Sequence, residues 1–242
     1  MADAHDDGAV PFTPALLVVD FQEDFCPPHG ALAVPQGRSI ASIVNLLLTL
    51  PFALRLATRD WHPPDHISFS ASHPGLRNGS TAAVVHPHDP SRRYDTLLWP
   101  THCVAGSPGA ALVPELRADC LDGVVDKGTD RRLEMYSAFY DPFRLVETGL
   151  AERLRAEAVT HVFVVGLAAD FCVAATAEHA RDEGFATYVV REATRPVYPD
   201  AWPASVQHVF DKGVRLVSVD GPEVARVRAL SRPSCPAPTP RD

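Results

Sequence analysis

The chain has 242 residues, 46% of them hydrophobic, which suits one α/β domain with a full-sized core. Its net charge of -8 and its scattered basic residues argue against nucleic acid or an anionic membrane surface as the main partner, whereas a small neutral substrate is compatible with them. No apolar run approaches the roughly 18 residues that cross a bilayer, and residues 1–10 are acidic and small, unlike a signal peptide. We therefore expect an intracellular, cytoplasmic protein.

Alternating strand-like and helix-like segments predict a doubly wound α/β fold. Short apolar runs predict strands at residues 15–19, 53–58, 123–126, 161–165, 187–190 and 214–219. Helical spacing predicts helices at residues 39–50, 149–157, 173–181, 202–212 and 221–230. Ser39 is the expected N-cap of the first helix. Right-handed crossovers then give a mainly parallel sheet with helices on both faces.

Two segments are expected to lack regular structure. Residues 78–91 are polar and show neither a helix nor a strand period, which predicts a long loop. Residues 231–242 are rich in proline and are expected to form a disordered tail. Residues 1–230 would then make up a single domain.

The five cysteines are odd in number, widely spaced and free of any CxxC pair. This pattern predicts neither a disulfide framework nor a thiolate zinc site, and a reducing compartment fits it. The cysteines are Cys26, Cys103, Cys120, Cys172 and Cys235.

Asp20 follows the first expected strand. Open α/β sheets bind ligands at the carboxyl ends of their strands, so Asp20 is a candidate site residue. For a lone aspartate in this place, a role as a cap or turn residue is the simpler alternative.

Asp60 and His62 follow the second expected strand, two residues apart. In extended chain their side chains point to the same side, and an oxygen with an imidazole suits Zn²⁺, Mn²⁺ or Fe²⁺. His66 would add a ligand if the Pro63–Pro64 turn folds it back. Because a surface loop with incidental histidines is the alternative, the site needs a third ligand from far along the chain.

His102 is the distant imidazole, in the segment LLWPTHCV. Trp99 offers a flat apolar wall for a ring-shaped ligand, although ordinary core packing is an equal alternative. Cys103 is expected to be structural, because neighbours in extended chain face opposite ways.

Lys127 ends the third expected strand as Asp20 ends the first. Cys172 falls at a strand-to-helix junction, where a helix N-terminus lowers a thiol pKa and supplies free N–H groups. Together these residues make a coherent triad in which Lys127 stabilises a thiolate and Asp20 accepts and later returns a proton. The alternatives are a solvated surface lysine and a buried structural cysteine.

Five motifs in one order carry a family resemblance. They are VVDFQEDF, TRDWHPPDHISF, LWPTHCV, VDKG with a following YSAF, and GLAADFCV, spread over residues 18–173. In these motifs the chain resembles the nicotinamidase (pyrazinamidase) branch of the isochorismatase-like cysteine hydrolases. The resemblance implies a six-stranded parallel sheet with helices on both faces. It also implies hydrolysis of nicotinamide to nicotinate and ammonia, a step of NAD salvage.

The resemblance further assigns roles to individual residues. It implies a catalytic triad of Asp20, Lys127 and Cys172. It implies one divalent metal ion, zinc before manganese or iron, on the ligands Asp60, His62 and His102. It implies that the pyridine ring is enclosed by Phe25, Trp99 and Tyr136. A cis peptide between Leu167 and Ala168, with the N–H groups of Ala168 and Cys172 as oxyanion donors, is implied as well.

Several alternatives stay open at this point. The chain would also suit a cysteine hydrolase of the same fold acting on another small amide, such as a carbamoyl compound. A non-catalytic metal-dependent binding module, with Cys172 merely buried, is a second alternative, and a metal hydrolase that uses bound water is a third. His66 could bind the metal directly, through water or not at all, and a homo-oligomer is compatible with the sequence.

Overall fold

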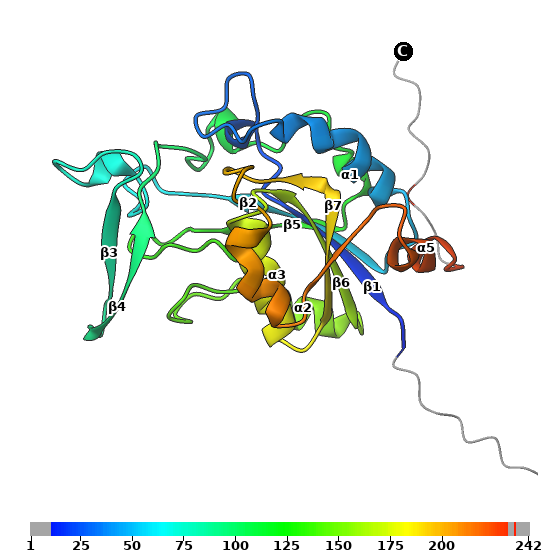
Figure 1. Ribbon diagram of the computed structural model, residues 1–242. Coiled ribbons are helices and arrows are strands. Elements are labelled where there is room, and N and C mark those ends of the chain that lie inside the picture. Colours follow the sequence, from blue (N-terminus) through cyan, green and yellow to red (C-terminus); the bar gives the residue numbers. More distant parts are fainter. Residues whose placement is uncertain (1–10, 232–234, 236–242) are drawn as a thin grey trace, which may run out of the picture.

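The computed structural model describes residues 11–231 and residue 235, and its centre is a six-stranded sheet (Figure 1). The strand order is β5-β2-β1-β6-β7-β8, and every neighbouring pair is parallel. The strands are β1 (Pro14–Val19), β2 (Leu54–Asp60), β5 (Gly123–Lys127), β6 (His161–Leu167), β7 (Ala186–Arg195) and β8 (Arg215–Val217). The predicted doubly wound, six-stranded parallel sheet is thus confirmed.

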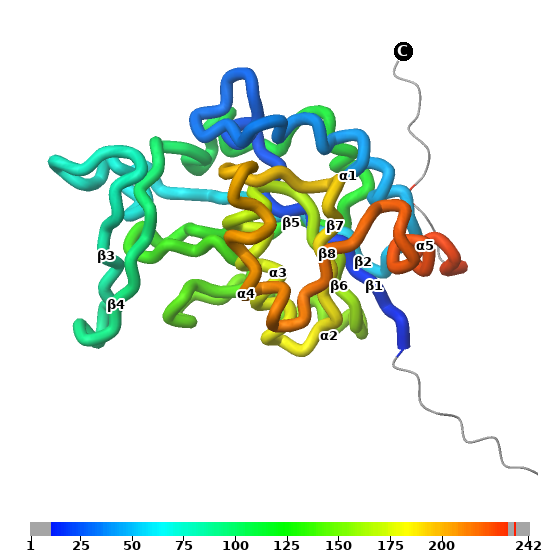
Figure 2. The backbone as a smooth tube through the Cα atoms, in the orientation of Figure 1, coloured from blue at the N-terminus to red at the C-terminus, as the bar shows by residue number. Residues whose placement is uncertain are grey.

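Helices cover both faces of this sheet (Figures 1 and 2). Because side chains alternate along a strand, Leu16 and Val18 of β1 enter one core and Leu17 and Val19 enter the other. The first core contains residues of α1 (Ala41–Leu48) and α5 (Pro222–Arg228). The second contains residues of α2 (Leu150–Ala156), α3 (Cys172–Asp182) and α4 (Gln207–Asp211). Among the described residues no helix is long and apolar enough to cross a membrane.

The observed helices differ from the predicted ones at their ends, and two of the differences have structural detail. A 3₁₀ turn at Gly37–Ile40 precedes α1, whose N-cap is Ile40 without a side-chain cap, so the prediction of Ser39 as N-cap is wrong. Only Gln207–Asp211 of the predicted helix at residues 202–212 is α-helical, after a 3₁₀ turn at Ala204–Val206. Residues 201–203 form a turn, in which the Trp202–Pro203 peptide bond is cis.

The prediction of a loop at residues 78–91 is wrong, because most of this segment belongs to an antiparallel hairpin. Its strands are β3 (Thr81–His86) and β4 (Asp89–Leu97), which project beside the main sheet (Figure 1). In β3 every second residue is buried, the period-two pattern of a half-buried strand. The hairpin is fixed to the body by Tyr94, whose hydroxyl donates to the Glu134 carbonyl and accepts from its N–H, both at 3.1 Å.

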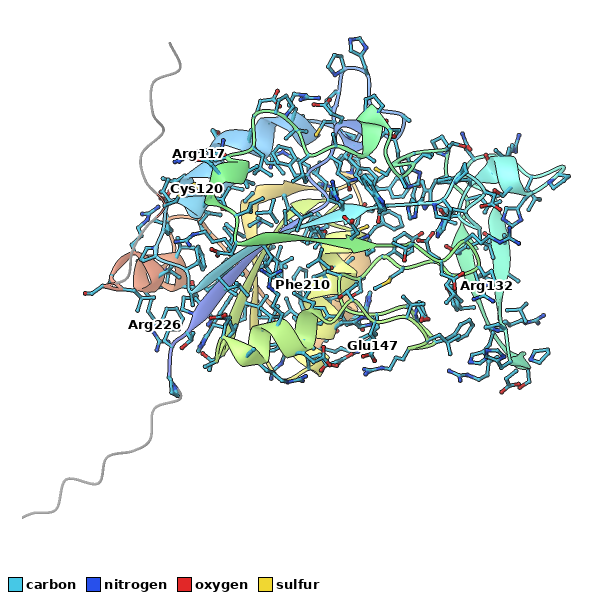
Figure 3. The ribbon with its side chains drawn as sticks, turned by 180° about the vertical axis from the view of Figure 1, so that it is seen from behind. Arg117, Cys120, Arg132, Glu147, Phe210 and Arg226 are labelled. Atoms are coloured by element: carbon cyan, nitrogen blue, oxygen red, sulfur yellow. A yellow bond between two sulfur atoms is a disulfide. The ribbon has the colours of Figure 1, made fainter. Side chains whose placement is uncertain are left out.

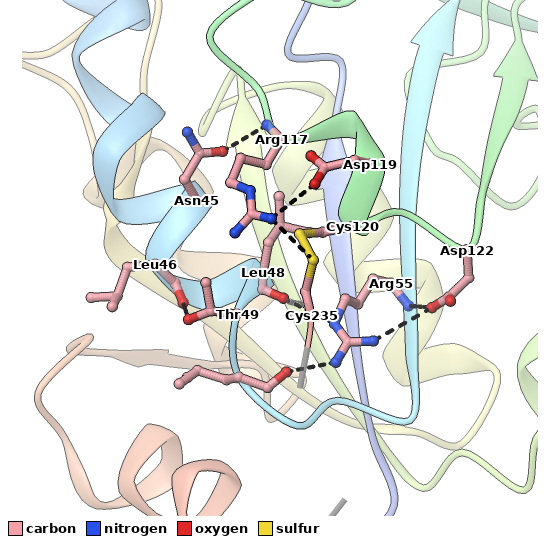
Figure 4. Close-up of a disulfide and its surroundings, with 11 residues drawn as sticks. Asn45, Leu46, Leu48, Thr49, Arg55, Arg117, Asp119, Cys120, Asp122 and Cys235 are labelled. Atoms are coloured by element: carbon pink, nitrogen blue, oxygen red, sulfur yellow. Dashed lines mark hydrogen bonds and ion pairs between the residues drawn. A yellow bond between two sulfur atoms is a disulfide. The ribbon is translucent and has the colours of Figure 1, made fainter. Parts of the chain in front are cut away.

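A disulfide joins Cys120 and Cys235, so the prediction of no disulfide is wrong (Figure 4). The two residues are 115 positions apart in the chain, but Cys235 lies beside the 3₁₀ turn Ala118–Cys120, and the Cα atoms lie 5.4 Å apart. Seen from behind in Figure 3, Cys120 lies on the same side of the molecule as Arg226 of α5. The expectation of a reducing compartment rested on unpaired cysteines and loses that support. Apart from Ser231 and Cys235, the tail predicted to be disordered lies outside the described residues.

Removal of this disulfide should lower the stability of the fold. We expect Cys235→Ser to reduce the free energy of unfolding by about 2–4 kcal/mol, because the unfolded chain regains the entropy that the cross-link removes. Urea unfolding of the variant and of wild type, each with and without dithiothreitol, measures the effect. Reduction should bring wild type to the stability of the variant and leave the variant unchanged. Equal stability of the two oxidised proteins would contradict the expectation.

Candidate active site and metal centre

Three adjacent strands bring Asp20, Asp60 and Lys127 to one edge of the sheet. Asp20 follows β1, and Asp60 ends β2 directly opposite Lys127, which ends β5. The turn after β6 places Cys172 at the first position of α3, so the predicted strand-to-helix junction is confirmed. All four side chains are buried, at 0–5% exposure, and they therefore interact in a medium that screens charges weakly.

The ammonium group of Lys127 lies among two carboxylates and a thiol. Its Nζ is 2.9 Å from Asp20 Oδ2, forms a close ion pair with Asp60 Oδ1 and lies 3.5 Å from Cys172 Sγ. It also donates a 3.2 Å hydrogen bond to the carbonyl of Met135. Burial lowers the pKa of Lys127, but the neighbouring Asp20 and Asp60 outweigh it and raise the pKa well above its usual value. Lys127 is thus a fixed positive charge beside the thiol.

Asp20 is oriented by Thr58 and faces the thiol. Thr58 Oγ1 donates to Asp20 Oδ1 at 2.5 Å and accepts from the Asp20 N–H at 3.1 Å. A carboxylate oxygen of Asp20 lies within 4.8 Å of Cys172 Sγ. Burial raises the pKa of Asp20 to about 6, although Lys127 opposes that rise. A carboxylate with this pKa can exchange a proton near neutral pH.

The Cys172 thiol does not have the lowered pKa expected at a helix start. Burial raises its pKa well above the usual value, the neighbouring carboxylates add to the rise, and Lys127 opposes it. At this position desolvation therefore raises the thiol pKa by more than the helix N-terminus lowers it. A thiol in this state needs a base to become a nucleophile, and Asp20 is the nearby group whose pKa suits the task.

The turn between β6 and α3 has the backbone geometry that the resemblance implies. The Leu167–Ala168 peptide bond is cis. The N–H groups of Phe171 and Val173 both donate to the Ala168 carbonyl at 3.1 Å. The N–H groups of Ala168 and Cys172 have no acceptor among the described residues. These two donors are therefore available to an oxygen atom of a substrate bound next to Cys172.

Asp60, His62 and His102 form a metal-ligand set, with donor atoms within 4.8 Å of one another. The Nδ1–H of His62 donates to the Gly128 carbonyl at 2.8 Å, and that of His102 donates to the Pro100 carbonyl at 2.7 Å. In each ring Nε2 is thus the nitrogen that faces Asp60 Oδ2, at 3.4 Å (His62) and 3.9 Å (His102).

This donor set fits a divalent ion. Two imidazoles oriented by backbone carbonyls, together with one carboxylate, suit Zn²⁺ and its first-row neighbours. Burial lowers the pKa of His102 to about 4, so its ring is neutral at pH 7 and can donate a lone pair. Gly128 has a φ of 65°, and a side chain there would meet the His62 ring at 2.4 Å, so only glycine leaves room for the ligand.

His66 lies next to the ligand set without joining it. Its Nδ1 accepts from Ser68 Oγ at 2.8 Å, and its Nε2–H donates to the Leu133 carbonyl at 3.0 Å. Its ring stacks on His62 with 4.0 Å between the centroids. Because both ring nitrogens have partners within the protein, His66 supports the His62 ring and offers no lone pair to an ion.

An apolar pocket opens between the thiol and the ligand set, with about 340 Å³ of space including its mouth. The residues predicted to line it all do so: Phe25, Trp99, Tyr136 and Ala168, with Asp60, His102 and Cys172. Trp99 Nε1–H donates to the Tyr136 hydroxyl at 3.0 Å, which holds the two aromatic walls together.

Four further lining residues were not predicted: Leu32, Val34, Phe171 and Val197. The Phe171 ring packs edge-on against Trp99 with centroids 5.0 Å apart, and its place directly before Cys172 was a signal for it. Leu32 and Val34 lie in an irregular loop, where no period marks a wall residue.

Comparisons with known proteins give one consistent result. A family model described as the isochorismatase domain matches residues 14–221. The nicotinamidase of Schizosaccharomyces pombe is 33% identical over 221 residues, which cover 90% of this chain and 99% of that protein. The nicotinamidase of Acinetobacter baylyi is 37% identical over 208 residues, covering 84% and 92%.

Solved structures that resemble this chain include members of the same group of enzymes. A yeast nicotinamidase bound to the inhibitor nicotinaldehyde has a TM-score of 0.81 and 31% identity over 85% of this chain and 99% of that chain. A pyrazinamidase of Pyrococcus horikoshii in complex with zinc has a TM-score of 0.66 and 34% identity, with 85% and 99% covered.

Proposed function

Because the chain belongs to the isochorismatase family, we propose that it is a nicotinamidase, which hydrolyses nicotinamide to nicotinate and ammonia and so feeds NAD salvage. One observation carries the proposal: Cys172, with Lys127 and Asp20 beside it, shares an apolar, aromatic-walled pocket with Asp60 and His102. A thiol beside a metal-ligand set suits a substrate with an amide at one end of a ring and a nitrogen lone pair at the other.

In the first half of the reaction, the bond to ammonia breaks. Asp20 takes the thiol proton, Lys127 stabilises the resulting thiolate, and the sulfur adds to the carboxamide carbon. The negative charge on the former carbonyl oxygen is stabilised by the N–H groups of Ala168 and Cys172. Protonated Asp20 then gives its proton to the departing nitrogen, which leaves as ammonia, and a thioester on Cys172 remains.

In the second half, water replaces the sulfur. Asp20 takes a proton from a water molecule, whose oxygen adds to the thioester carbon, and the same two N–H groups stabilise the oxyanion. The carbon–sulfur bond then breaks, nicotinic acid leaves, and the proton held by Asp20 returns to the Cys172 thiolate. Asp20 and Cys172 end in their starting states, so the cycle is balanced.

The residues around the ring position it for this attack. Phe25, Trp99, Tyr136 and Phe171 line an apolar space, which favours an uncharged aromatic ring. We take zinc as the ion held by Asp60, His62 and His102, and when bound it supplies a Lewis-acid site that orients the ring through its nitrogen. The support for zinc is the donor set and the zinc-bound pyrazinamidase relative.

Ammonia release from nicotinamide, with and without a chelator, tests the proposed function. We expect the chelator to lower activity more than tenfold and added zinc to restore it, because the ring loses its orienting contact. His62→Ala should lose zinc and raise KM, whereas His208→Ala, an exposed histidine on α4, should do neither. A chain that binds zinc but releases ammonia only from carbamoyl compounds would instead favour a different small-amide hydrolase of this fold.

A further inference from the structure

The Gln22 side chain bonds both the N–H and the carbonyl group of Asp60. It is fully buried, and its Oε1 accepts from the Asp60 N–H at 2.8 Å. Its Nε2 donates to the Asp60 carbonyl at 2.8 Å and to the Ala110 carbonyl at 2.9 Å. All the hydrogen-bonding atoms of this amide are thus used, and two of its three bonds end on one proposed metal ligand.

The strand geometry explains why Asp60 needs a side-chain partner. The ladder between β1 and β2 ends at the pair Val18–Ala57, because the chain leaves the strand at Asp20, where φ is 47°. Asp60 lies three residues beyond Ala57 and has no strand partner on that side, although Lys127 pairs with it on the other. The Gln22 amide therefore takes the place of the missing strand.

Asp24 acts in the same way on the histidine ligands. Its Oδ2 accepts a 2.7 Å hydrogen bond from the N–H of Cys103. Cys103 directly follows His102 and has a φ of 47°. The Cys103 carbonyl in turn accepts from the His62 N–H at 3.0 Å. Asp24 thus fixes the peptide that lies between the two imidazole ligands. Gly109 packs against the Asp24 carboxylate, because a Cβ added at this position would lie 2.1 Å from it.

From these contacts we infer that Gln22 and Asp24 are positioning residues for the metal centre. They hold the backbones of Asp60, His62 and His102 in the geometry that brings the three donor atoms together. The inference rests on the metal centre of the proposed function and adds residues that touch neither ion nor substrate. A buried amide is costly unless it is fully bonded, so a core residue without this task would be better apolar.

Zinc affinity tests the inference without relying on activity. The variants are Gln22→Met, which keeps the side-chain length but none of the hydrogen bonds, and Asp24→Leu, which keeps the approximate side-chain size but offers no acceptor to the Cys103 N–H. Gln207→Ala is the matched control, because the Gln207 side chain bonds Asp211 on α4 and lies outside the site. Each full-length protein is stripped of metal, checked for folding by circular dichroism, and titrated with zinc against a chromophoric chelator.

We expect the zinc Kd to rise about 10–100-fold in both variants and to stay within twofold in the control. Nicotinamide hydrolysis by the variants should be low at limiting zinc and recover towards the wild-type kcat at saturating zinc. A Kd within twofold of wild type in the folded variants would overturn the inference, and Asp24→Leu decides alone if Gln22→Met does not fold. If wild type itself binds no zinc, the proposed metal centre fails first, and the inference falls with it.

Discussion

Cys172→Ala is expected to abolish ammonia release from nicotinamide, with kcat falling about 10⁴–10⁶-fold, the loss seen when a covalent nucleophile is removed. The thiol lies 3.5 Å from Lys127 Nζ and within 4.8 Å of an Asp20 oxygen, and the methyl group of alanine can neither give up a proton nor attack a carbon. Steady-state ammonia release measures the loss. Hydroxylamine should trap nicotinic acid hydroxamate from wild-type turnover and none from the variant.

The same variant separates catalysis from binding. Cys172 is not among Asp60, His62 and His102, so Cys172→Ala should still bind zinc and, through the aromatic walls, nicotinamide. Cys26→Ala is the matched control, since Cys26 is an equally buried free cysteine within the α1-side core and should leave kcat within a few-fold. Sustained ammonia release by Cys172→Ala would rule out the covalent mechanism and favour attack by a metal-bound water.

Much of the fold is readable from the sequence because its central strands are buried on both faces. In β1 and β6 every residue is buried, and such strands read as unbroken apolar runs. Their ends carry Asp20 and the turn to Cys172, so the edge that holds the site follows from the strand order. The proximity of Asp20, Lys127 and Cys172 was predictable because each residue follows a strand or lies in a motif, and the same holds for Asp60, His62 and His102.

Other features depend on contacts that no local pattern records. The hairpin was missed because buried and exposed positions alternate in β3 while its sequence, TAAVVH, does not alternate between apolar and polar residues, and because β4 is largely exposed. The Cys120–Cys235 disulfide was missed because only the folded path of the chain brings together residues 115 positions apart. The raised thiol pKa of Cys172 was missed because burial is a property of the packed site, whereas the helix start could be read locally.

Gln22 and Asp24 show a further limit. They belong to the motif VVDFQEDF, yet nothing in their spacing says that one bonds Asp60 and the other Cys103. Both bonds span long sequence separations and end on backbone groups, which carry no residue identity. A sequence can therefore name such residues as motif members but cannot assign their partners.

Asp20→Asn is expected to lower kcat about 10³-fold, within the range that a general acid–base group contributes. The amide of asparagine cannot take the Cys172 proton or give one to the leaving nitrogen. It can still accept from Thr58 Oγ1, so the turn after β1 should keep its shape. Asp126→Asn is the control, because Asp126 lies on β5 in an exposed ion pair with Arg59 and should leave kcat unchanged.

The pH profile gives this prediction a second readout. Burial raises the pKa of Asp20 to about 6, and only the ionised carboxylate accepts the thiol proton. Wild-type kcat/KM should therefore reach its plateau about one pH unit above this pKa, stand at half of the plateau near pH 6, and fall about tenfold for each pH unit well below it. In Asp20→Asn the residual activity should lack this acidic limb, because the group that titrates is gone. An unchanged limb in the variant would assign the titration to another group and remove Asp20 from its role as the base.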